Sequence, residues 1–148
     1  MGEFWPVEDV LAYLAGSWRV ERTVRDLASD AEGRFTGTTV FEPLGDDGGL
    51  LHRESGTFVW QGVARPAERT LRFLPGRTPG TALVRFSDGR PFHDLDLTGG
   101  RYVADHPCAA DLYRGEFSVR DENHWRSVWR VRGPAKDLVL STGYTRPT

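Results

Sequence analysis

After Gly16, the sequence consists of short runs of alternating apolar and polar residues, separated by turn-forming dipeptides at near-regular spacing. The clearest turn dipeptides are Pro75-Gly76, Pro79-Gly80, Asp88-Gly89, Gly99-Gly100 and Gly133-Pro134. Alternation puts successive side chains on opposite faces of a strand, and glycine and proline suit the backbone angles of tight turns. This pattern predicts an antiparallel meander that closes into a barrel.

About ten short strands fit the pattern. The alternating runs are 17–26, a second run that carries Phe35, Thr39 and Phe41, and then 50–60, 70–74, 82–87, 92–97, 101–105, 112–120, 124–132 and 138–146. A closed sheet has no free edges, so the first and last strands should pair with each other. The predicted fold class is therefore all-β, an up-and-down antiparallel β-barrel.

One segment near the N-terminus is typical of a helix instead. Trp5-Pro6 places a proline near the first helical turn, and Val10, Leu11 and Leu14 recur at helical spacing. Gly16 follows at the position of a left-handed cap. We expect a single helix of about three turns over residues 6–15.

The composition narrows the function classes. The 148 residues suffice for one domain, 1–148, and carry 19 Lys and Arg against 21 Asp and Glu, for a net charge of −2. Nucleic-acid-binding proteins usually show a basic excess, so nucleic acid is not an expected partner. No apolar run approaches the ~20 residues of a membrane span, and no secretory signal pattern is present. The single cysteine, Cys108, excludes an internal disulfide and favours a cytoplasmic location.

An arginine is predicted inside the barrel. Arg22 lies between Val20 and Val24 on the strand face that carries Trp18. A guanidinium in that position needs a carboxylate, an anionic ligand or an aromatic face beside it. Glu54 is the natural partner if its strand face points inward, although a slip of one residue in register would turn it outward. We favour the inward register.

A histidine is also predicted inside. His93 shares a strand face with Leu95 and Leu97, whereas the opposite face carries Phe92, Asp94 and Asp96. Because the apolar face should be the interior, we expect the His93 ring in the cavity. An imidazole titrates near neutral pH and can act there as general acid or base. The alternative is a core histidine that is hydrogen-bonded to a neighbouring strand.

A second polar cluster is formed by His106-Pro107-Cys108, Asp111 and Tyr113. Proline interrupts strand pairing, so the cluster is predicted on a loop or at the barrel rim. Four interpretations stay open: the start of a metal site, a Cys108 nucleophile activated by His106, a rim where Asp111 orients His106 and the Tyr113 hydroxyl reaches the cavity, and a tight loop. Two ligands without a second pair are too few for a metal site, so no metal is predicted.

Aromatic residues are expected to line the interior. Trp125 and Trp129 share a face with Ser127 and Val131, and Tyr113 shares another with Phe117. Aromatic walls suit a planar ligand, and they suit the filling of a core equally well. The candidate ligand-binding residues are Arg22, Glu54, His93, Tyr113, Trp125 and Trp129. The candidate catalytic residues are His93, His106, Asp111 and Tyr113.

The helix followed by Gly16-Ser17-Trp18, with Arg146 near the other end of the chain, resembles the calycins: lipocalins, fatty-acid-binding proteins and the ten-stranded nitrobindins. The resemblance implies a barrel in which a late basic residue packs over the tryptophan. The segments 91–97, 106–108 and 111–115 also look like a bacterial family of unknown function. The nitrobindin haem histidine lies near the end of the chain, where this sequence has none.

Three functions are compatible with these features. The first is a barrel that binds a small hydrophobic or aromatic molecule in its central cavity. The second is a small cofactor-independent enzyme, such as a cyclase, isomerase or dehydratase, that uses a cavity histidine as general acid or base. The third is haem or gas binding. No phosphate-binding loop, serine-hydrolase elbow or complete metal set is present, so no cofactor is predicted. The sequence leaves open whether the protein forms a homodimer.

Overall fold

The computed structural model describes residues 4–45, 48–108 and 110–147, without the side chain of Cys108. It contains one short helix and ten strands, which confirms the predicted fold class. The elements are α1 (Val10–Leu14), β1 (Gly16–Asp26), β2 (Ala31–Leu44), β3 (Gly49–Trp60), β4 (Val63–Pro75), β5 (Thr81–Phe86), β6 (Pro91–Asp96), β7 (Arg101–Cys108), β8 (Asp111–Asp121), β9 (His124–Gly133) and β10 (Lys136–Thr145).

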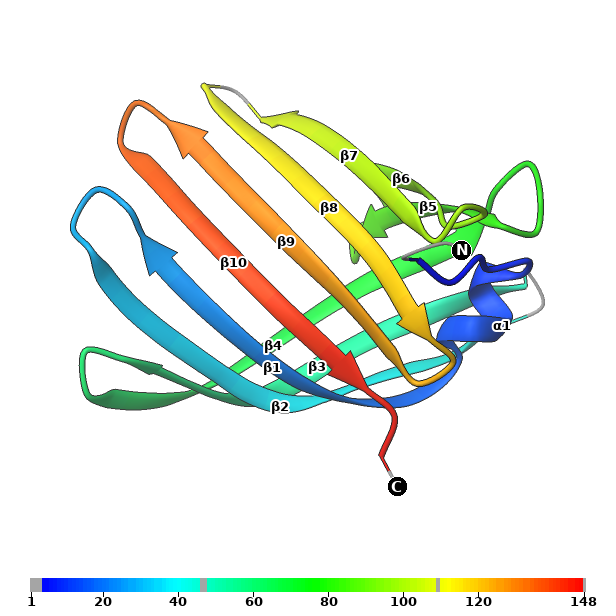
Figure 1. Cartoon of the computed structure of the whole chain (residues 1–148), viewed down its shortest axis with the longest axis horizontal. Coiled ribbons are helices and arrows are strands. Elements are labelled where there is room, and N and C mark those ends of the chain that lie inside the picture. Colours follow the sequence, from blue (N-terminus) through cyan, green and yellow to red (C-terminus); the bar gives the residue numbers. More distant parts are fainter. Residues whose placement is uncertain (1–3, 46–47, 109, 148) are drawn as a thin grey trace.

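All ten strands form one antiparallel sheet in the order β6-β5-β4-β3-β2-β1-β10-β9-β8-β7. The predicted pairing of the first and last strands is confirmed, because β1 and β10 pair from Arg19–Thr145 to Asp26–Leu138. The sheet curves into a nearly closed barrel whose two edge strands are β6 and β7 (Figure 1). One side-chain hydrogen bond joins these edges, from the Tyr102 hydroxyl to Asp94 Oδ1 at 2.8 Å.

The helix is much shorter than the predicted span of 6–15. It begins after Asp9, whose carboxylate caps the amide of Ala12 at 3.1 Å. The preceding residues are extended because their amides pair with strand ends: Trp5 N–H donates to the Val119 carbonyl at 2.8 Å and Val7 N–H donates to the Leu97 carbonyl at 3.0 Å. Pro6 therefore belongs to a segment that packs against one end of the barrel, outside the helix.

Two strand predictions also require correction. The fourth strand is predicted from residue 70, but β4 begins at Val63, because its exposed first half pairs with β3 from Trp60–Val63 onward. The segment with His106 and Pro107 is predicted on a loop or at the barrel rim; it is not a loop, because it forms the end of β7 and pairs with β8. Because β7 is an edge strand, a proline there need not remove a sheet hydrogen bond.

Burial falls along the barrel axis. Inward residues near α1 are fully buried, including Trp18 and Val20 on β1, whereas Val24 further along the strand is only partly buried. On β10 the same change runs from buried Tyr144 to partly buried Leu140. In Figure 1, α1 lies at the right and the β1–β2 and β9–β10 hairpins project at the left. The barrel is therefore filled beside α1 and more accessible at the opposite end. Among the helices of the described residues, none is long and apolar enough to cross a membrane.

Candidate functional site

A buried ion pair lies at the centre of the barrel interior. Arg22 on β1 and Glu54 on β3 meet in a bidentate arrangement, with Nη1 at 2.7 Å from Oε1 and Nη2 at 3.0 Å from Oε2. The Glu54 side chain is 2% exposed and that of Arg22 is 12% exposed. The predicted inward register of Glu54 and its pairing with Arg22 are thus confirmed. A parallel two-bond fork of this kind holds both groups in fixed positions.

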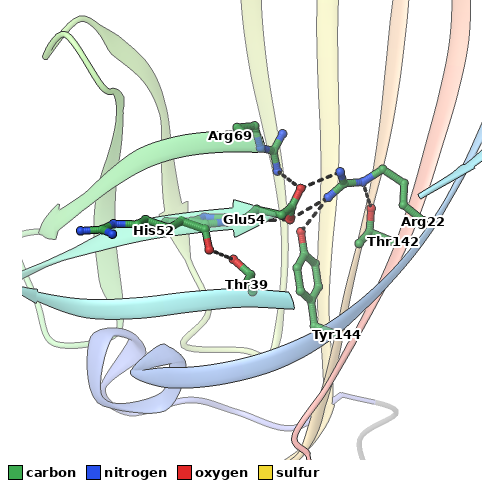
Figure 2. Close-up of polar contacts among 8 residues, drawn as sticks. Arg22, Thr39, His52, Glu54, Arg69, Thr142 and Tyr144 are labelled. Carbon is green, nitrogen blue, oxygen red and sulfur yellow. Dashed lines mark hydrogen bonds and ion pairs between the residues drawn. The ribbon is translucent and has the colours of Figure 1, made fainter. Parts of the chain in front are cut away.

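Other side chains complete the arginine's surroundings. Arg22 Nε donates to Thr142 Oγ1 at 2.8 Å, and Nη2 donates to the Tyr144 hydroxyl oxygen at 3.4 Å (Figure 2). The guanidinium also lies 5.2 Å from the centre of the Phe35 ring. Both acceptors come from β10, which pairs with β1 at Arg22–Thr142 and Val20–Tyr144. The β1–β10 pairing therefore positions the polar partners of Arg22.

A second arginine faces the same carboxylate. Arg69 on β4 is paired with Glu54 across the sheet, and its Nη2 lies 3.9 Å from Glu54 Oε1. Burial raises the pKa of the Glu54 carboxyl, but the guanidiniums of Arg22 and Arg69 outweigh burial and hold that pKa well below its ordinary value. The His52 Nε2 atom is 3.8 Å from Oε2, too far for a hydrogen bond, so we ascribe the shift to the arginines. Glu54 is therefore ionised at neutral pH.

Three buried nitrogens beside this cluster lack partners. Neither ring nitrogen of His52 nor the indole nitrogen of Trp125 has a hydrogen-bond partner among the described residues. His52 packs against two aromatic rings, with 4.6 Å between its ring centre and that of Phe41 and 5.5 Å to that of Phe73. Burial lowers the pKa of His52, so its ring is neutral at pH 7. A neutral imidazole offers one donor and one acceptor, and an indole offers one donor.

His93 lies in the interior, as its strand face predicts. Its ring packs against Phe117, with 5.3 Å between ring centres, and against Trp129, also at 5.3 Å. Its Nδ1 is 2.7 Å from the backbone carbonyl oxygen of Asp94, which places the proton on Nδ1 and leaves Nε2 as the acceptor. Burial lowers the pKa of His93 to about 4, so the ring is neutral at pH 7.

One space adjoins the ion pair, and a second adjoins Arg69 and Tyr144. The first, which we term the mouth pocket, has a volume of about 220 Å³ and is lined by Arg22, Val24, Phe35, Glu54, Phe58, Ala67, Glu68, Arg69 and Leu140. The second, which we term the inner cavity, has a volume of about 20 Å³ and is lined by His52, Arg69, Leu71, Phe73, Phe92, His93, Phe117, Trp125, Ser127, Trp129 and Tyr144. Arg69 lines both, and it lies at the boundary between them.

The structure divides the candidate ligand-binding residues between these two spaces. Arg22 and Glu54 line the mouth pocket, and His93, Trp125 and Trp129 line the inner cavity. Trp129 can lie flat against the strand beside it because that position is Gly115, where a Cβ would lie 2.7 Å from the indole. Phe92 was predicted on the outer face with Asp94, but its ring stacks on Trp129 at 5.3 Å. A bulge between Val84 and Arg85 shifts the register beside Phe92.

The second polar cluster is only partly assembled. His106 and Tyr113 pair across β7 and β8, with ring centres 6.0 Å apart, and neither lines the mouth pocket or the inner cavity. Asp111 does not orient His106: it pairs with the Cys108 position, and its Oδ2 lies 3.3 Å from Lys136 Nζ. The Cys108 side chain, and with it the proposed nucleophile, lies outside the described residues. Within the part of the chain that the structure describes, no group of three His, Cys, Asp or Glu side chains could hold a metal ion.

Sequence reasoning missed Arg69, and it assigned no site role to His52 or Thr142. Arg69 falls in a segment with no apolar alternation, so the predicted strand begins one residue after it. The alternation of side chains along the strand does indicate that Arg69 faces inward. Residues 67, 69, 71 and 73 share one face of β4, and Leu71 and Phe73 on that face are buried. Extending the strand backwards from Leu71 would have placed Arg69 on the inward face.

The fold and this geometry define a class: a ten-stranded antiparallel barrel with a buried charged cluster beside an interior pocket. The chain belongs to a family of unknown function, DUF6314, whose model matches residues 14–146. No curated protein matches the chain with significant similarity.

Solved structures of similar fold share little sequence with the chain. An S-type phycobiliprotein lyase, CPES from Guillardia theta, superimposes with a TM-score of 0.71 at 10% identity, covering 97% of this chain and 94% of the lyase. A DUF3598 protein of unknown function from Nostoc punctiforme gives 0.67 at 12% identity, covering 98% of this chain and 51% of that protein. A de novo designed fluorescence-activating β-barrel gives 0.52 at 16% identity, with coverage of 95% and 100%. At these identities the likeness concerns the fold alone.

Proposed function

We propose that this protein binds a small hydrophobic or aromatic molecule inside its barrel, with the molecule's body in the mouth pocket. The observation that carries this proposal is a fixed ion pair beside a pocket that is otherwise largely apolar. Phe35, Phe58 and Leu140 supply the apolar walls, and the Arg22–Glu54 pair supplies the polar side. Binding sites for small molecules commonly combine apolar walls with a few fixed polar groups.

The pocket volume limits the size of the ligand. Small-molecule pockets commonly measure roughly 300–1,000 Å³. The mouth pocket, at about 220 Å³, is smaller, and the inner cavity adds about 20 Å³. The expected ligand is accordingly a compact molecule of one or two rings. Arg22 and Glu54 would orient it, while His93, Trp125 and Trp129 would contact the end that lies deepest.

The structural neighbours support binding in general. One is called a lyase of phycobiliproteins and another a fluorescence-activating barrel.

The position of Arg146 over Trp18, with 3.7 Å from guanidinium carbon to ring centre, supports a calycin-like assignment. A single cysteine supports a cytoplasmic location. Tyr113 keeps a proposed role only in contacting a ligand that extends toward β7 and β8.

Native mass spectrometry of the purified protein tests the proposal. We expect a co-purifying small molecule in the wild type that is lost in Ala67→Trp, because Ala67 lines the mouth pocket and an indole would fill it. Ala64→Trp is the matched control, since Ala64 is exposed on the same strand and on the opposite face. A molecule that stays bound to Ala67→Trp would contradict binding in the mouth pocket.

A second candidate function is catalysis without a cofactor, and the geometry of His93 favours it. The Asp94 carbonyl fixes the Nδ1 proton, which leaves Nε2 free to accept a proton in a largely apolar setting. In an enzyme, His93→Ala should lower turnover of the co-purified molecule about 10²–10⁴-fold. In a binding protein it should weaken affinity by only ~0.5–3 kcal/mol.

A Soret band in the purified protein would favour haem binding instead.

A further inference from the structure

The lining of the inner cavity includes buried polar groups without partners and one permanent charge. Trp125 Nε1–H and the His52 ring are buried without partners, and both residues line this cavity. Arg69 is the one permanently charged residue among the described residues of the lining. Its guanidinium is 3.9 Å from Glu54, a carboxylate that already holds Arg22 in two shorter bonds. The positive charge of Arg69 is therefore only partly compensated.

Buried polar groups without partners are costly, and proteins rarely retain them without a reason. An indole N–H can only donate, so its missing partner must be an acceptor. The neutral His52 ring can donate to the same acceptor, and Arg69 can supply the opposite charge. An oxygen that carries negative charge suits each of these groups, because it accepts from the indole and imidazole donors and opposes the charge of Arg69, and charge-assisted hydrogen bonds are stronger than neutral ones.

The geometry points to a carboxylate on the ligand: we propose that the molecule bound in the mouth pocket places an anionic oxygen in the inner cavity, against Arg69, Trp125 and His52. This inference rests on the proposed function and specifies the class of ligand. The cavity volume of about 20 Å³ admits one small group, which matches a carboxylate oxygen and excludes a ring. Arg69 adjoins both spaces, so it can contact the carboxylate of a molecule whose rings remain in the mouth pocket.

The test compares 2-naphthoate with 2-naphthamide, which has nearly the same shape and no charge. Isothermal titration calorimetry at pH 7.5 should show 2-naphthoate binding the wild type at least ~10-fold more tightly, as expected for charged hydrogen bonds. Arg69→Gln should abolish this preference, because 2-naphthoate loses its charged partner and should then bind no more tightly than 2-naphthamide. Trp125→Phe, which removes only the N–H donor, should weaken 2-naphthoate binding by ~2–10-fold.

Arg72→Gln is the matched control, because Arg72 is exposed on the outer face of the same strand. It should keep the full preference for 2-naphthoate. The Arg69 side chain is 41% exposed, so Arg69→Gln is expected to fold, and circular dichroism verifies it. The wild-type comparison needs no variant at all.

The outcomes separate this inference from the proposed function. Equal affinity of the wild type for both compounds would mean that the inner cavity holds solvent only, and it would overturn the carboxylate inference. Persistence of the preference in Arg69→Gln would overturn it as well. If 2-naphthamide still binds and Ala67→Trp blocks it, the proposed function stands in both cases. If neither compound binds, the proposed function fails, and the carboxylate inference fails with it.

Discussion

The guanidinium carbon of Arg146 lies 3.7 Å from the centre of the Trp18 ring, which joins the end of the last strand to the start of the first. Arg146 Nη1 donates to the Ala15 carbonyl at 2.9 Å, and Nη2 donates to the Tyr13 carbonyl. The Trp18 indole N–H donates to the Leu14 carbonyl at 2.8 Å. These contacts satisfy the carbonyls at the end of α1 and attach the helix to the filled end of the barrel.

Trp18→Ala should reduce the free energy of unfolding by ~3–5 kcal/mol. Trp18 is fully buried, and its removal leaves a cavity between α1 and Trp125. Urea denaturation measures the loss. Trp5→Ala provides the comparison, because Trp5 is 44% exposed and its removal should cost much less. A loss below ~1 kcal/mol for Trp18→Ala would place this indole outside the stabilising core.

Arg22→Met should destabilise the fold by ~3–5 kcal/mol, because it leaves the Glu54 carboxylate buried without its main partner. The double variant Arg22→Met/Glu54→Leu should recover most of that loss, since it removes both charges. Urea denaturation of the single and double variants gives the coupling energy. A double variant at least as unstable as Arg22→Met alone would show that the loss does not come from an unpaired Glu54 carboxylate.

Acid should destabilise the protein over a pH range that is set by the pKa of the buried His93. The pKa of His93 is about 4 in the fold and about 6.5 when unfolded, so protonation favours the unfolded chain. Stability is therefore full above pH 6.5 and falls as pH drops toward 4, by ~2–3 kcal/mol from His93. His93→Gln should flatten this slope in denaturation curves recorded between pH 7.5 and 4.5. An unchanged slope would show that His93 is solvated.

Protonation of Glu54 also destabilises the fold as the pH falls, but at lower pH than protonation of His93. The folded pKa of Glu54 lies below its ordinary value, so its stabilising contribution is present above about pH 4.5 and is lost as pH falls further. Glu54→Gln should therefore reduce the additional loss of stability below pH 4.5, in denaturation curves that extend the series to lower pH. A variant that loses stability below pH 4.5 as steeply as the wild type would contradict the ionised pair.

The two edge strands should separate more readily in Tyr102→Phe. The Tyr102 hydroxyl donates to Asp94 Oδ1 at 2.8 Å across the edges of β7 and β6. Removing one exposed hydrogen bond should cost ~0.5–1.5 kcal/mol and speed amide exchange in β6. Hydrogen exchange with mass spectrometry measures the rate, and β2, remote from this edge, serves as the internal control. Unchanged exchange in β6 would show that this hydrogen bond does not hold the edges together.

The strands and the Arg22–Glu54 pair could be predicted because both depend on local alternation. Turn dipeptides separate the strands, and a period of two puts Arg22 on the face of Trp18. The length of β4 could not be predicted in this way, since its first half is stabilised by pairing with β3 and buries little apolar surface. Arg69 was missed for that reason.

Two further errors come from backbone pairing that the alternation of residues does not reveal. Pro6 and the apolar spacing after it are typical of a helix start, but the amides of Trp5 and Val7 pair with carbonyls of Val119 and Leu97. Those partners lie far along the chain, so no local pattern reveals them. Phe92 turned inward because of the bulge beside Arg85, which changes the parity of a strand without a distinct sequence signal.

A crystal structure of the complex with 2-naphthoate tests the central claim most directly. The naphthalene rings should lie in the mouth pocket, in contact with Phe35 and Phe58, and the carboxylate should lie within hydrogen-bond distance of Arg69. Density for the compound only on the outer face of the barrel, with both interior spaces unchanged, would contradict binding inside the barrel.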